Sequence, residues 1–399
     1  MADLPLLRLK KNEERRLRSG HLWIFSNEVD TAQTPLKGFT AGDLAVIESA
    51  RGEALGTAYV NPDSLIAARI LSRDPRKSIN TAFFRKRLER ALGLREWAYG
   101  TPHYRLVFGE SDGLPGLIID RFGEVFALQT NTAGMEKLQP LIVEALDALF
   151  SPQAVVIRNT SSARRLEGLA DDTRVVIGAL SDPIEIEENG ARFRIDPLQG
   201  QKTGWFYDHR DNRAALTRWC PGKRVLDLFA YTGAWGLPAA LAGAELVECV
   251  DASAPALELA ADNARLNGVA GRMRFTGADV FDFLRQAREE RHHYDVIVLD
   301  PPAFIKRKKD VAKGLEAYRR LNQAALQVLA PGGLLVSASC SFHLSRDSLH
   351  DLLRASARHL DRHLVFVARG GQAADHPVHP AIPETDYLKA FFCQAGPSL

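Results

Sequence analysis

The second half of the chain, after Pro197, alternates short apolar runs with amphipathic stretches. Short apolar runs bounded by turn residues are typical of buried strands, and apolar residues spaced three and four apart are typical of helices. Strands are predicted at 225–229, 246–251, 273–275, 295–299, 334–338, 364–368 and 388–392. Helices are predicted at 255–266, 281–291 and 315–329. This alternation favours an α/β domain with a doubly wound, seven-stranded sheet that binds ligands where its strands end.

The first half shows two other patterns. Up to residue 73, apolar segments separated by glycines and the Asn61-Pro62-Asp63 turn predict a small antiparallel β-barrel with strands at 44–48, 54–60 and 64–71. After a linker at 73–77, a central α+β domain is predicted, with helices at 81–94 and 135–149 and strands at 104–108, 116–120, 125–129, 154–158 and 175–177. A hairpin at 184–188 and 191–195 turns at Asn189-Gly190. We therefore expect three domains, at 1–73, 74–196 and 197–399.

The amino-acid composition excludes several classes of protein. The 399 residues include 51 Lys and Arg against 49 Asp and Glu, so any affinity for nucleic acid must come from local basic patches. With 46% hydrophobic residues, the chain is not disordered, collagenous or membrane-embedded. The four cysteines lack zinc-ligand spacing, so we expect no metal site and a reducing compartment. Without a spanning helix or a signal-peptide pattern, we expect a soluble cytoplasmic protein.

The segment from Val225 to Gly236, Val-Leu-Asp-Leu-Phe-Ala-Tyr-Thr-Gly-Ala-Trp-Gly, places an acid at a strand end and glycines where a helix begins. Glycines there let the backbone approach a ligand closely. Asp251 and Asp279 follow the next two strands, where carboxylates can bind ribose hydroxyls and an adenine amino group. The dinucleotide pattern GxGxxG is absent, and three acids would repel a polyphosphate. The pattern favours an adenosine with a cationic or neutral tail, although each acid alone is more often a helix cap.

This segment resembles the S-adenosylmethionine-binding core of class I methyltransferases, whose fourth-strand loop faces the methyl donor. Here the fourth predicted strand ends in Asp300-Pro301-Pro302, a motif typical of nucleic-acid base methylation. The fifth ends in Ser339-Cys340-Ser341, which makes Cys340 a candidate nucleophile. The other three cysteines are interpreted as small buried hydrophobic residues: Cys220, Cys249 and Cys393. A thiolate that adds to C6 of a pyrimidine makes C5 nucleophilic enough to accept a methyl group, whereas an exocyclic nitrogen needs no such help.

Two basic segments are candidates for RNA contacts. One contains Arg15 and Arg16 and precedes Trp23, and the other, Lys306-Arg307-Lys308-Lys309, closely follows the Asp-Pro-Pro motif. Charge runs are usually solvated faces, and this interpretation is favoured for the first segment. For the second, its position beside the motif makes contact with RNA phosphates an equal alternative.

Over nearly its full length, the chain resembles the ribosomal RNA large-subunit cytosine-C5 methyltransferases that carry an N-terminal PUA domain. The segments that carry the resemblance are 21–26, 110–121, 201–210, 374–377 and 383–389. The resemblance implies a PUA-like RNA-binding barrel, S-adenosylmethionine as cofactor, and formation of 5-methylcytosine in 23S ribosomal RNA. The implied partner is large-subunit ribosomal RNA, with no membrane; the oligomeric state is left open, with a homodimer as one alternative.

The resemblance also implies the roles of individual residues. Cys340 and Asp300 would be catalytic. The implied cofactor-binding residues are Asp227, Phe229, Tyr231, Thr232, Gly233, Asp251, Ala252, Asp279, Asp300, Lys202 and Arg210. Lys202 or Arg210 would pair with the donor's carboxylate. The RNA-binding residues would be Arg15, Arg16, Lys306, Arg307 and Lys308. His376 is either a proton acceptor or a structural loop residue.

One position departs from a common pattern of RNA cytosine-C5 methyltransferases. Many of them carry a second cysteine in the fourth-strand motif, but Ala303 follows Asp300-Pro-Pro here. The resemblance therefore implies a single-cysteine mechanism, with water or Asp300 as the final base. Uridine-C5 and base-nitrogen methylation remain alternatives. A catalytically silent RNA-binding assembly factor is a third alternative, against which the complete set of acids, glycine and cysteine argues.

Overall fold

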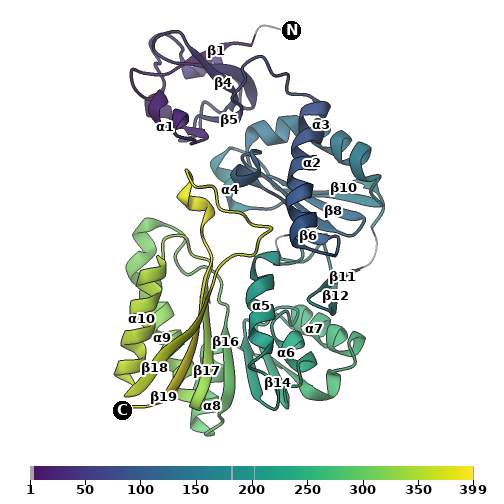
Figure 1. The fold of residues 1–399 in the computed structure, drawn as a ribbon, viewed down its shortest axis with the longest axis vertical. Coiled ribbons are helices and arrows are strands. Elements are labelled where there is room, and N and C mark those ends of the chain that lie inside the picture. The colour runs from purple at the N-terminus through teal and green to yellow at the C-terminus, as the bar shows by residue number, and fades with distance from the viewer. Residues whose placement is uncertain (1–3, 181–182, 202, 399) are drawn as a thin grey trace. The chain divides into compact units, whose positions relative to one another are not determined.

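The computed structural model describes residues 4–180, 183–201 and 203–398 and separates into two compact units (Figure 1). The first unit comprises Met1–Ile184, Asp196–Trp205 and Ala374–Thr385, and the second comprises Glu185–Ile195, Phe206–Ala373 and Asp386–Leu399. The three domain boundaries expected from the sequence stay predictions. In the described part of the chain, no helix is long and apolar enough to cross a membrane.

The first unit begins with a small sheet of strand order β1-β3-β4-β5-β2. Its elements are β1 (Leu6–Arg8), α1 (Glu14–Arg18), β2 (Trp23–Ile24), β3 (Asp43–Glu48), β4 (Ala54–Val60) and β5 (Ala68–Ser72). Apart from the parallel pair β1–β3, neighbouring strands are antiparallel. The strand predicted at 64–71 starts later than expected, because Asn61 N donates to Ala67 O and closes a loop over the intervening residues. The short strands β1 and β2 were not predicted, because they contain too few residues to show the alternation of apolar and polar positions that marks a strand.

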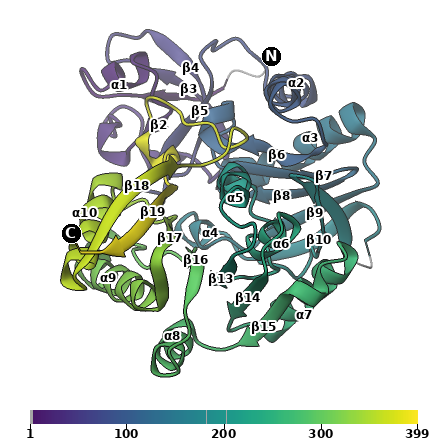
Figure 2. The ribbon, with the colours of Figure 1, turned by 60° about the horizontal axis from the view of Figure 1, so that its bottom comes forward.

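A second sheet in the same unit has the order β10-β9-β8-β7-β6. Its elements are α2 (Thr81–Ala98), β6 (His103–Phe108), β7 (Leu117–Phe122), β8 (Val125–Thr130), α3 (Ala133–Phe150), β9 (Ala154–Asn159), α4 (Ser162–Leu166) and β10 (Asp172–Gly178). The apolar faces of α2 and α3 pack on this sheet in one core (Figure 2). Each of these helices begins at a side-chain cap, Asn80 for α2 and Thr132 for α3.

The second unit opens with the predicted hairpin of β11 (Ile184–Glu188) and β12 (Ala191–Ile195). Asn189 and Gly190 at its turn have φ of 52° and 78°, the left-handed pair that a two-residue hairpin turn requires. The position of this turn confirms the prediction from the Asn-Gly pair.

The main sheet of the second unit has the strand order β15-β14-β13-β16-β17-β19-β18. Its strands are β13 (Arg224–Leu228), β14 (Leu246–Asp251), β15 (Met273–Gly277), β16 (Tyr294–Leu299), β17 (Leu329–Ser339), β18 (Arg362–Gly370) and β19 (Lys389–Pro397). Only β19 runs antiparallel to its neighbours. The chain order reverses between β13 and β16, so the crevice beyond the ends of these strands is the expected ligand site. The seven-stranded, doubly wound sheet predicted from the sequence is confirmed.

Helices cover both faces of this sheet (Figures 1 and 2). They are α5 (Arg210–Thr217), α6 (Gly236–Leu241), α7 (Ala254–Leu266), α8 (Val280–Glu289), α9 (Val311–Val328) and α10 (Arg346–His359). Side chains of α8, α9 and α10 share one core with the strands, while α5, α6 and α7 lie on the other face. The sequence analysis missed α10, although Leu349, Leu353 and Ala357 recur at helical spacing.

Candidate functional site

The turn after β13 holds its backbone in a strained conformation. Phe229 and Tyr231 have φ of 63° and 48°, values that cost non-glycine residues about 1–3 kcal/mol each. Two hydrogen bonds to β14 hold them there: Ala230 N donates to Val250 O at 3.1 Å, and Tyr231 N donates to Asp251 Oδ2 at 2.9 Å. The strand neighbour thus fixes a turn whose backbone points outward from the sheet edge.

Asp227 is the next-to-last residue of β13, just before this turn, and is fully buried. Its Oδ2 accepts a hydrogen bond from Gly236 N at 2.8 Å, and a Cβ at Gly236 would lie 2.6 Å from Cys249 Sγ. Burial, together with the nearby carboxylates of Asp300 and Asp251, raises the pKa of Asp227 to about 8.

Two buried polar atoms in the segment from Asp227 to Thr232 lack hydrogen-bond partners among the described residues. They are Oδ1 of Asp227 and Oγ1 of Thr232. Unsatisfied polar atoms are costly and rare in protein interiors, so two of them within this short segment indicate a place for a polar ligand. Gly233 has a φ of 81°, which glycine adopts without strain, and a Cβ there would face Ala260 of α7 at 3.4 Å.

The other two acids of the predicted cofactor site differ in their surroundings. Asp251 ends β14, and besides Tyr231 N its carboxylate accepts from Ser253 N at 2.8 Å, so it holds both the turn after β13 and the start of the segment that leads into α7. Asp279 is exposed and caps α8, with Oδ1 accepting from the amides of Phe281 and Asp282. Asp279 therefore has the capping role that the sequence left open, and its contact with a ligand stays a prediction.

Asp300 directly follows β16 and lies in a cluster of three side chains. Trp235 Nε1 donates to its Oδ2 at 3.0 Å, and His209 Nε2 lies 3.2 Å from its Oδ1. Burial by itself would raise the pKa of Asp300, but the His209 imidazole and the Trp235 hydrogen bond outweigh burial and lower it. With 24% of its side chain exposed, Asp300 is a carboxylate open to a ligand at neutral pH.

The His209 ring is fixed by a second contact, which the sequence analysis did not foresee. Its Nδ1 lies 3.0 Å from the amide nitrogen of Asn212, and that amide also donates to Gly371 O at 2.8 Å. With Nδ1 as acceptor, the neutral ring carries its proton on Nε2, toward Asp300. The only sequence signal for His209 was its place in the segment 201–210, next to Arg210.

Cys340 follows the last residue of β17 and differs from the other cysteines. All four cysteines lie in the described part of the chain, and Cys340 alone is not buried. Burial raises the pKa of the Cys220 thiol to about 12 and raises those of Cys249 and Cys393 as well. These three remain protonated at neutral pH, in agreement with their interpretation as buried hydrophobic residues.

Lys389, at the start of β19, is a neighbour of Cys340 that the sequence analysis did not single out. It pairs with Ser339 across the sheet, and its ammonium donates to Ser341 O at 2.6 Å and Tyr387 O at 2.9 Å. Only 5% of Lys389 is exposed, and among the described residues no carboxylate forms an ion pair with it. Burial lowers the pKa of Lys389 to about 8, although its interaction with Cys340 works against this shift. The signal in the sequence was a lysine within an apolar strand.

Two candidates for the donor's carboxylate stay predictions. Lys202 lies outside the described residues. Arg210 is 4% exposed, its Nε lies 3.6 Å from Glu188 Oε2, and its guanidinium stacks 5.1 Å above the ring of Tyr207.

The predicted RNA-binding residues occur in both units. In the first, Arg15 is exposed, and Arg16 pairs with Glu28 at 2.7 Å. In the second, three exposed residues precede α9: Lys306, Arg307 and Lys308.

His376 belongs to the first unit and is 1% exposed, with Nδ1 2.8 Å from Asp375 Oδ1. Its burial supports the structural alternative for this histidine.

Comparison with known proteins identifies both parts of the chain. A family model described as an S-adenosylmethionine-dependent methyltransferase matches residues 171–392, and a PUA-like domain model matches residues 7–73. A ribosomal RNA large subunit methyltransferase I from Shewanella denitrificans is 40% identical over 96% of this chain and 97% of its own length. The protein of the same name from Cronobacter sakazakii is 38% identical over 96% and 98%.

Solved structures agree on the fold. The methyltransferase SMU.776, solved with SAH, superimposes with a TM-score of 0.83 over 98% of this chain and all of its own, at 22% identity. A structure of a SAM-dependent methyltransferase from Streptococcus mutans gives a TM-score of 0.81 at 21% identity, again over 98% of this chain and all of its own. By the breadth of these matches, the chain belongs to the S-adenosylmethionine-dependent methyltransferases and, within them, to the family of ribosomal RNA large subunit methyltransferase I.

Proposed function

We propose that this protein methylates C5 of a cytosine in large-subunit ribosomal RNA and that Cys340 is its nucleophile. The observation that carries the proposal is the pairing of β16 with β17, in which Leu299 lies opposite Ser337. Because the two strands are parallel neighbours, Asp300 and Cys340 follow at the same edge of the sheet. A carboxylate and an accessible thiol beside a methyl-donor site suit attack on a pyrimidine ring.

The turn after β13 fits S-adenosylmethionine. Bound there, this cofactor supplies an electrophilic methyl group, which C5 accepts. The unpartnered oxygens of Asp227 and Thr232 offer polar contacts, and Gly233 lets the backbone approach the ligand. Asp251 keeps acceptor capacity for ribose hydroxyls, because each carboxylate oxygen can accept more than one hydrogen bond. Contacts from the remaining predicted residues complete the proposal: Phe229, Tyr231, Ala252, Asp279, Asp300, Lys202 and Arg210.

Lys389 supports the ionisation of Cys340. The buried ammonium and the thiolate stabilise each other, so Lys389 lowers the cost of the charged sulfur. The thiolate forms a bond to C6 of the cytosine, which raises the electron density at C5. Once C5 carries the new methyl group, its proton leaves to a base and the bond between sulfur and C6 breaks.

Asp300 is suited to the later step of the reaction, removal of the C5 proton. Its lowered pKa keeps it ionised, so it accepts protons and hydrogen bonds rather than donating them. An ionised carboxylate can take the C5 proton directly or through a water molecule. The contact with His209 Nε2 orients Asp300 Oδ1 and leaves the exposed part of the carboxylate for the substrate.

The site of action follows from the substrate. The relatives are bacterial, and ribosomal RNA of bacteria is made and assembled in the cytoplasm, so we assign the reaction to that compartment.

The experiment that tests the function is nucleoside analysis of treated RNA. Deproteinised, unmodified large-subunit ribosomal RNA is incubated with the protein and S-adenosylmethionine carrying a labelled methyl group, and the digest is separated and analysed by mass spectrometry. The proposal predicts label in 5-methylcytidine. Label in 5-methyluridine or in a nitrogen-methylated base would refute the cytosine-C5 assignment, and an absence of label together with RNA binding would favour an assembly factor.

A further inference from the structure

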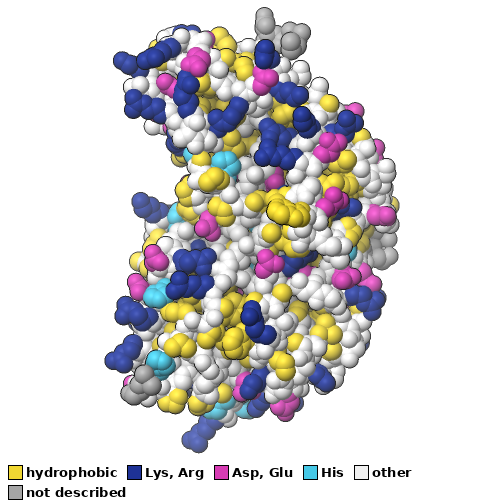
Figure 3. Space-filling view, viewed as in Figure 1, with side chains coloured by type: hydrophobic (Ala, Val, Ile, Leu, Met, Phe, Trp, Pro, Cys, Tyr) yellow, Lys and Arg dark blue, Asp and Glu magenta, His cyan; other side chains and the backbone are white. Residues whose placement is uncertain are grey.

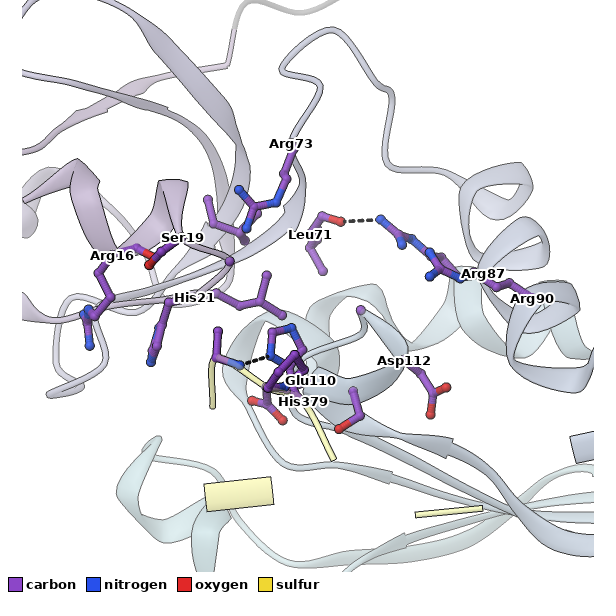
Figure 4. A pocket seen from close by; sticks show the side chains of 17 residues that line it. Arg16, Ser19, His21, Leu71, Arg73, Arg87, Arg90, Glu110, Asp112 and His379 are labelled. Atoms are coloured by element: carbon purple, nitrogen blue, oxygen red, sulfur yellow. Dashed lines mark hydrogen bonds between the residues drawn. The ribbon is translucent and has the colours of Figure 1, made fainter. Parts of the chain in front are cut away.

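A cavity of about 760 Å³ lies within the first unit, and none of the residues assigned above to methyl transfer lines it (Figure 4). Its wall is formed by the segment after α1, by the end of β5, by α2, by the turn 110–113 and by residues 379–381. Four arginines line it: Arg16, Arg73, Arg87 and Arg90. In Figure 4, Arg16 lies on one side and Arg87 and Arg90 on the other, with Arg73 between them in this view.

Three of these arginines carry charges that no acid neutralises within the described part of the chain. Arg16 pairs with Glu28, but Arg73, Arg87 and Arg90 form no ion pair there. Arg87 instead donates to Leu71 O at 3.0 Å. Arg73 donates to Leu17 O at 2.9 Å. Backbone carbonyls hold these two guanidinium groups in place without cancelling their charge.

The cavity is shaped around Arg87. A Cβ at Gly113 would lie 2.9 Å from Arg87 Nη1, so this glycine leaves the space that the guanidinium occupies. Burial and the neighbouring Arg90 lower the pKa of Arg87, which is the effect of placing two like charges together in a half-buried site. An anion between the two arginines would relieve this repulsion.

The two acidic residues of the cavity wall, Glu110 and Asp112, already accept hydrogen bonds from other side chains. Asp112 receives two hydrogen bonds from the fully buried Arg95, at 2.6 and 2.8 Å. Glu110 Oε1 accepts from Trp23 Nε1 at 2.9 Å. Arg95 therefore neutralises the charge of Asp112. The arginines without an ion pair leave the cavity with a net positive charge.

Two histidines add neutral donors. Trp23 N donates to His21 Nδ1 at 3.0 Å, and Ala381 N donates to His379 Nδ1 at 3.2 Å. With Nδ1 as acceptor, each neutral ring carries its proton on Nε2. Burial lowers the pKa of both imidazoles, so both are neutral at pH 7 and can donate hydrogen bonds without adding charge.

We propose that this cavity binds consecutive backbone phosphates of the RNA substrate and so holds the RNA on the first unit. The proposal rests on the proposed function in one respect, namely that RNA is the substrate. Arginines from three separate elements suit a chain of phosphates better than one small anion. No phenylalanine, tyrosine or tryptophan lines the cavity, so it offers no stacking surface of that kind for bases. Contacts to phosphates fix the position of the RNA and leave the choice of base to the methyl-transfer site.

The surface around the cavity agrees with this assignment. Figure 3 shows Lys and Arg side chains gathered over the part of the first unit that carries α1 and β1–β5. A basic surface of this kind attracts RNA over a distance, and the cavity would then bind its backbone.

The test measures RNA binding directly, without turnover. A labelled fragment of large-subunit ribosomal RNA is titrated with the full-length protein at several salt concentrations, without methyl donor. We expect Arg90→Glu to weaken binding roughly tenfold, and Arg90→Gln to reduce the slope of log affinity against log salt by about one. Arg90 is exposed and makes no described hydrogen bond, so neither change removes a contact on which folding depends. Unfolding temperatures of the variants check this.

Arg165→Glu is the control, because Arg165 is an exposed cation of the same unit that does not line the cavity and is not on α2. Its affinity for RNA should stay within about twofold of the wild type. Equal losses in the control and in Arg90→Glu would overturn the proposal, as would unchanged binding in Arg90→Glu. Pyrophosphate separates RNA from a small anion: if Arg90→Glu loses pyrophosphate binding but keeps RNA binding, the assignment to RNA is wrong.

The two proposals fail differently. If the wild type binds RNA through Arg90 but forms no 5-methylcytidine, the proposed function fails and the cavity assignment stands. If the wild type forms 5-methylcytidine but Arg90→Glu binds RNA normally, the cavity assignment fails and the proposed function stands.

Discussion

The turn after β13 and the end of β17 lie at the same edge of one sheet, but they are built in different ways. The turn takes its polar groups from a run of consecutive residues, Asp227 to Gly236, with Asp251 from the neighbouring strand. The end of β17 takes Cys340 from one strand, Lys389 from the antiparallel β19, and its neighbour Asp300 from β16. The first is a local sequence motif, and the second exists only once the sheet has formed.

Substitutions in the two regions should therefore have different effects. A change in the turn should alter affinity for the methyl donor, because the turn contributes contacts and a fixed backbone. A change at the end of β17 should alter the reaction rate and its pH dependence, because that region contributes a charge on sulfur. Four substitutions separate these effects.

The largest effect is expected for Cys340→Ala. Without the thiol, no bond to C6 can form, and kcat should fall by roughly 10⁴-fold or more while affinity for S-adenosylmethionine stays unchanged. Single-turnover methylation and calorimetric binding of the donor measure the two quantities. Cys220→Ala, which removes a buried thiol outside the site, is the control and should keep its activity. A Cys340→Ala protein with appreciable turnover would assign the enzyme to base-nitrogen chemistry.

Asp251→Ala should act on the donor instead. The change removes the acceptor for Tyr231 N and the predicted partner of the ribose hydroxyls, so we expect the Kd for S-adenosylmethionine to rise about 10- to 100-fold. Asp251→Asn keeps an acceptor for the backbone and should lose less affinity. If donor affinity is unaffected while kcat falls, the turn after β13 is not the cofactor site.

Lys389→Met should change the pH profile. Loss of the ammonium raises the pKa of the Cys340 thiol, so the rising limb of kcat/KM should move to higher pH by about one unit or more. The rate at pH 7 should fall about tenfold and recover as the pH rises. Lys389→Arg, which keeps the positive charge, should restore much of the profile. A uniform loss of rate at every pH would mean that Lys389 only supports the structure.

The smallest effect on the reaction is expected for Asp227→Asn, for which the measured quantity is the free energy of unfolding. Asp227 has its pKa raised to about 8 by burial, so the folded protein holds a proton there that the unfolded chain releases near its ordinary value. The stabilisation from this proton is fully present below about pH 4, where the unfolded chain is protonated too, and is lost as the pH rises from there to about 8. We expect the stability of the variant relative to the wild type to increase as the pH rises from 5 to 8, by at most about 1.4 kcal/mol per pH unit, and to level off above pH 8. Parallel stability curves over this pH range would contradict the raised pKa.

The contrast between a local motif and a site that forms only with the sheet also explains which features could be predicted from the sequence. The seven strands of the second unit and the Asn189-Gly190 hairpin were predictable, because hydrophobic period and turn chemistry are local properties. The positions of Asp227 and Cys340 were predictable because each lies next to the end of a strand. His209 and Lys389 were not identified, because their roles depend on which strands become neighbours. Arg16 was predicted as an RNA-binding residue, but Arg73, Arg87 and Arg90 were missed, because the fold alone brings the end of β5 and α2 to one cavity.

Covalent capture of the RNA would show whether Cys340 attacks C6. RNA that contains 5-fluorocytosine is incubated with the protein and S-adenosylmethionine, because fluorine at C5 cannot leave as a proton does and the adduct persists. The account predicts a complex that survives denaturing electrophoresis, whose linked peptide contains Cys340, and that is absent with Cys340→Ala. An active wild-type protein that forms no such complex, or a complex that persists in Cys340→Ala, would contradict it.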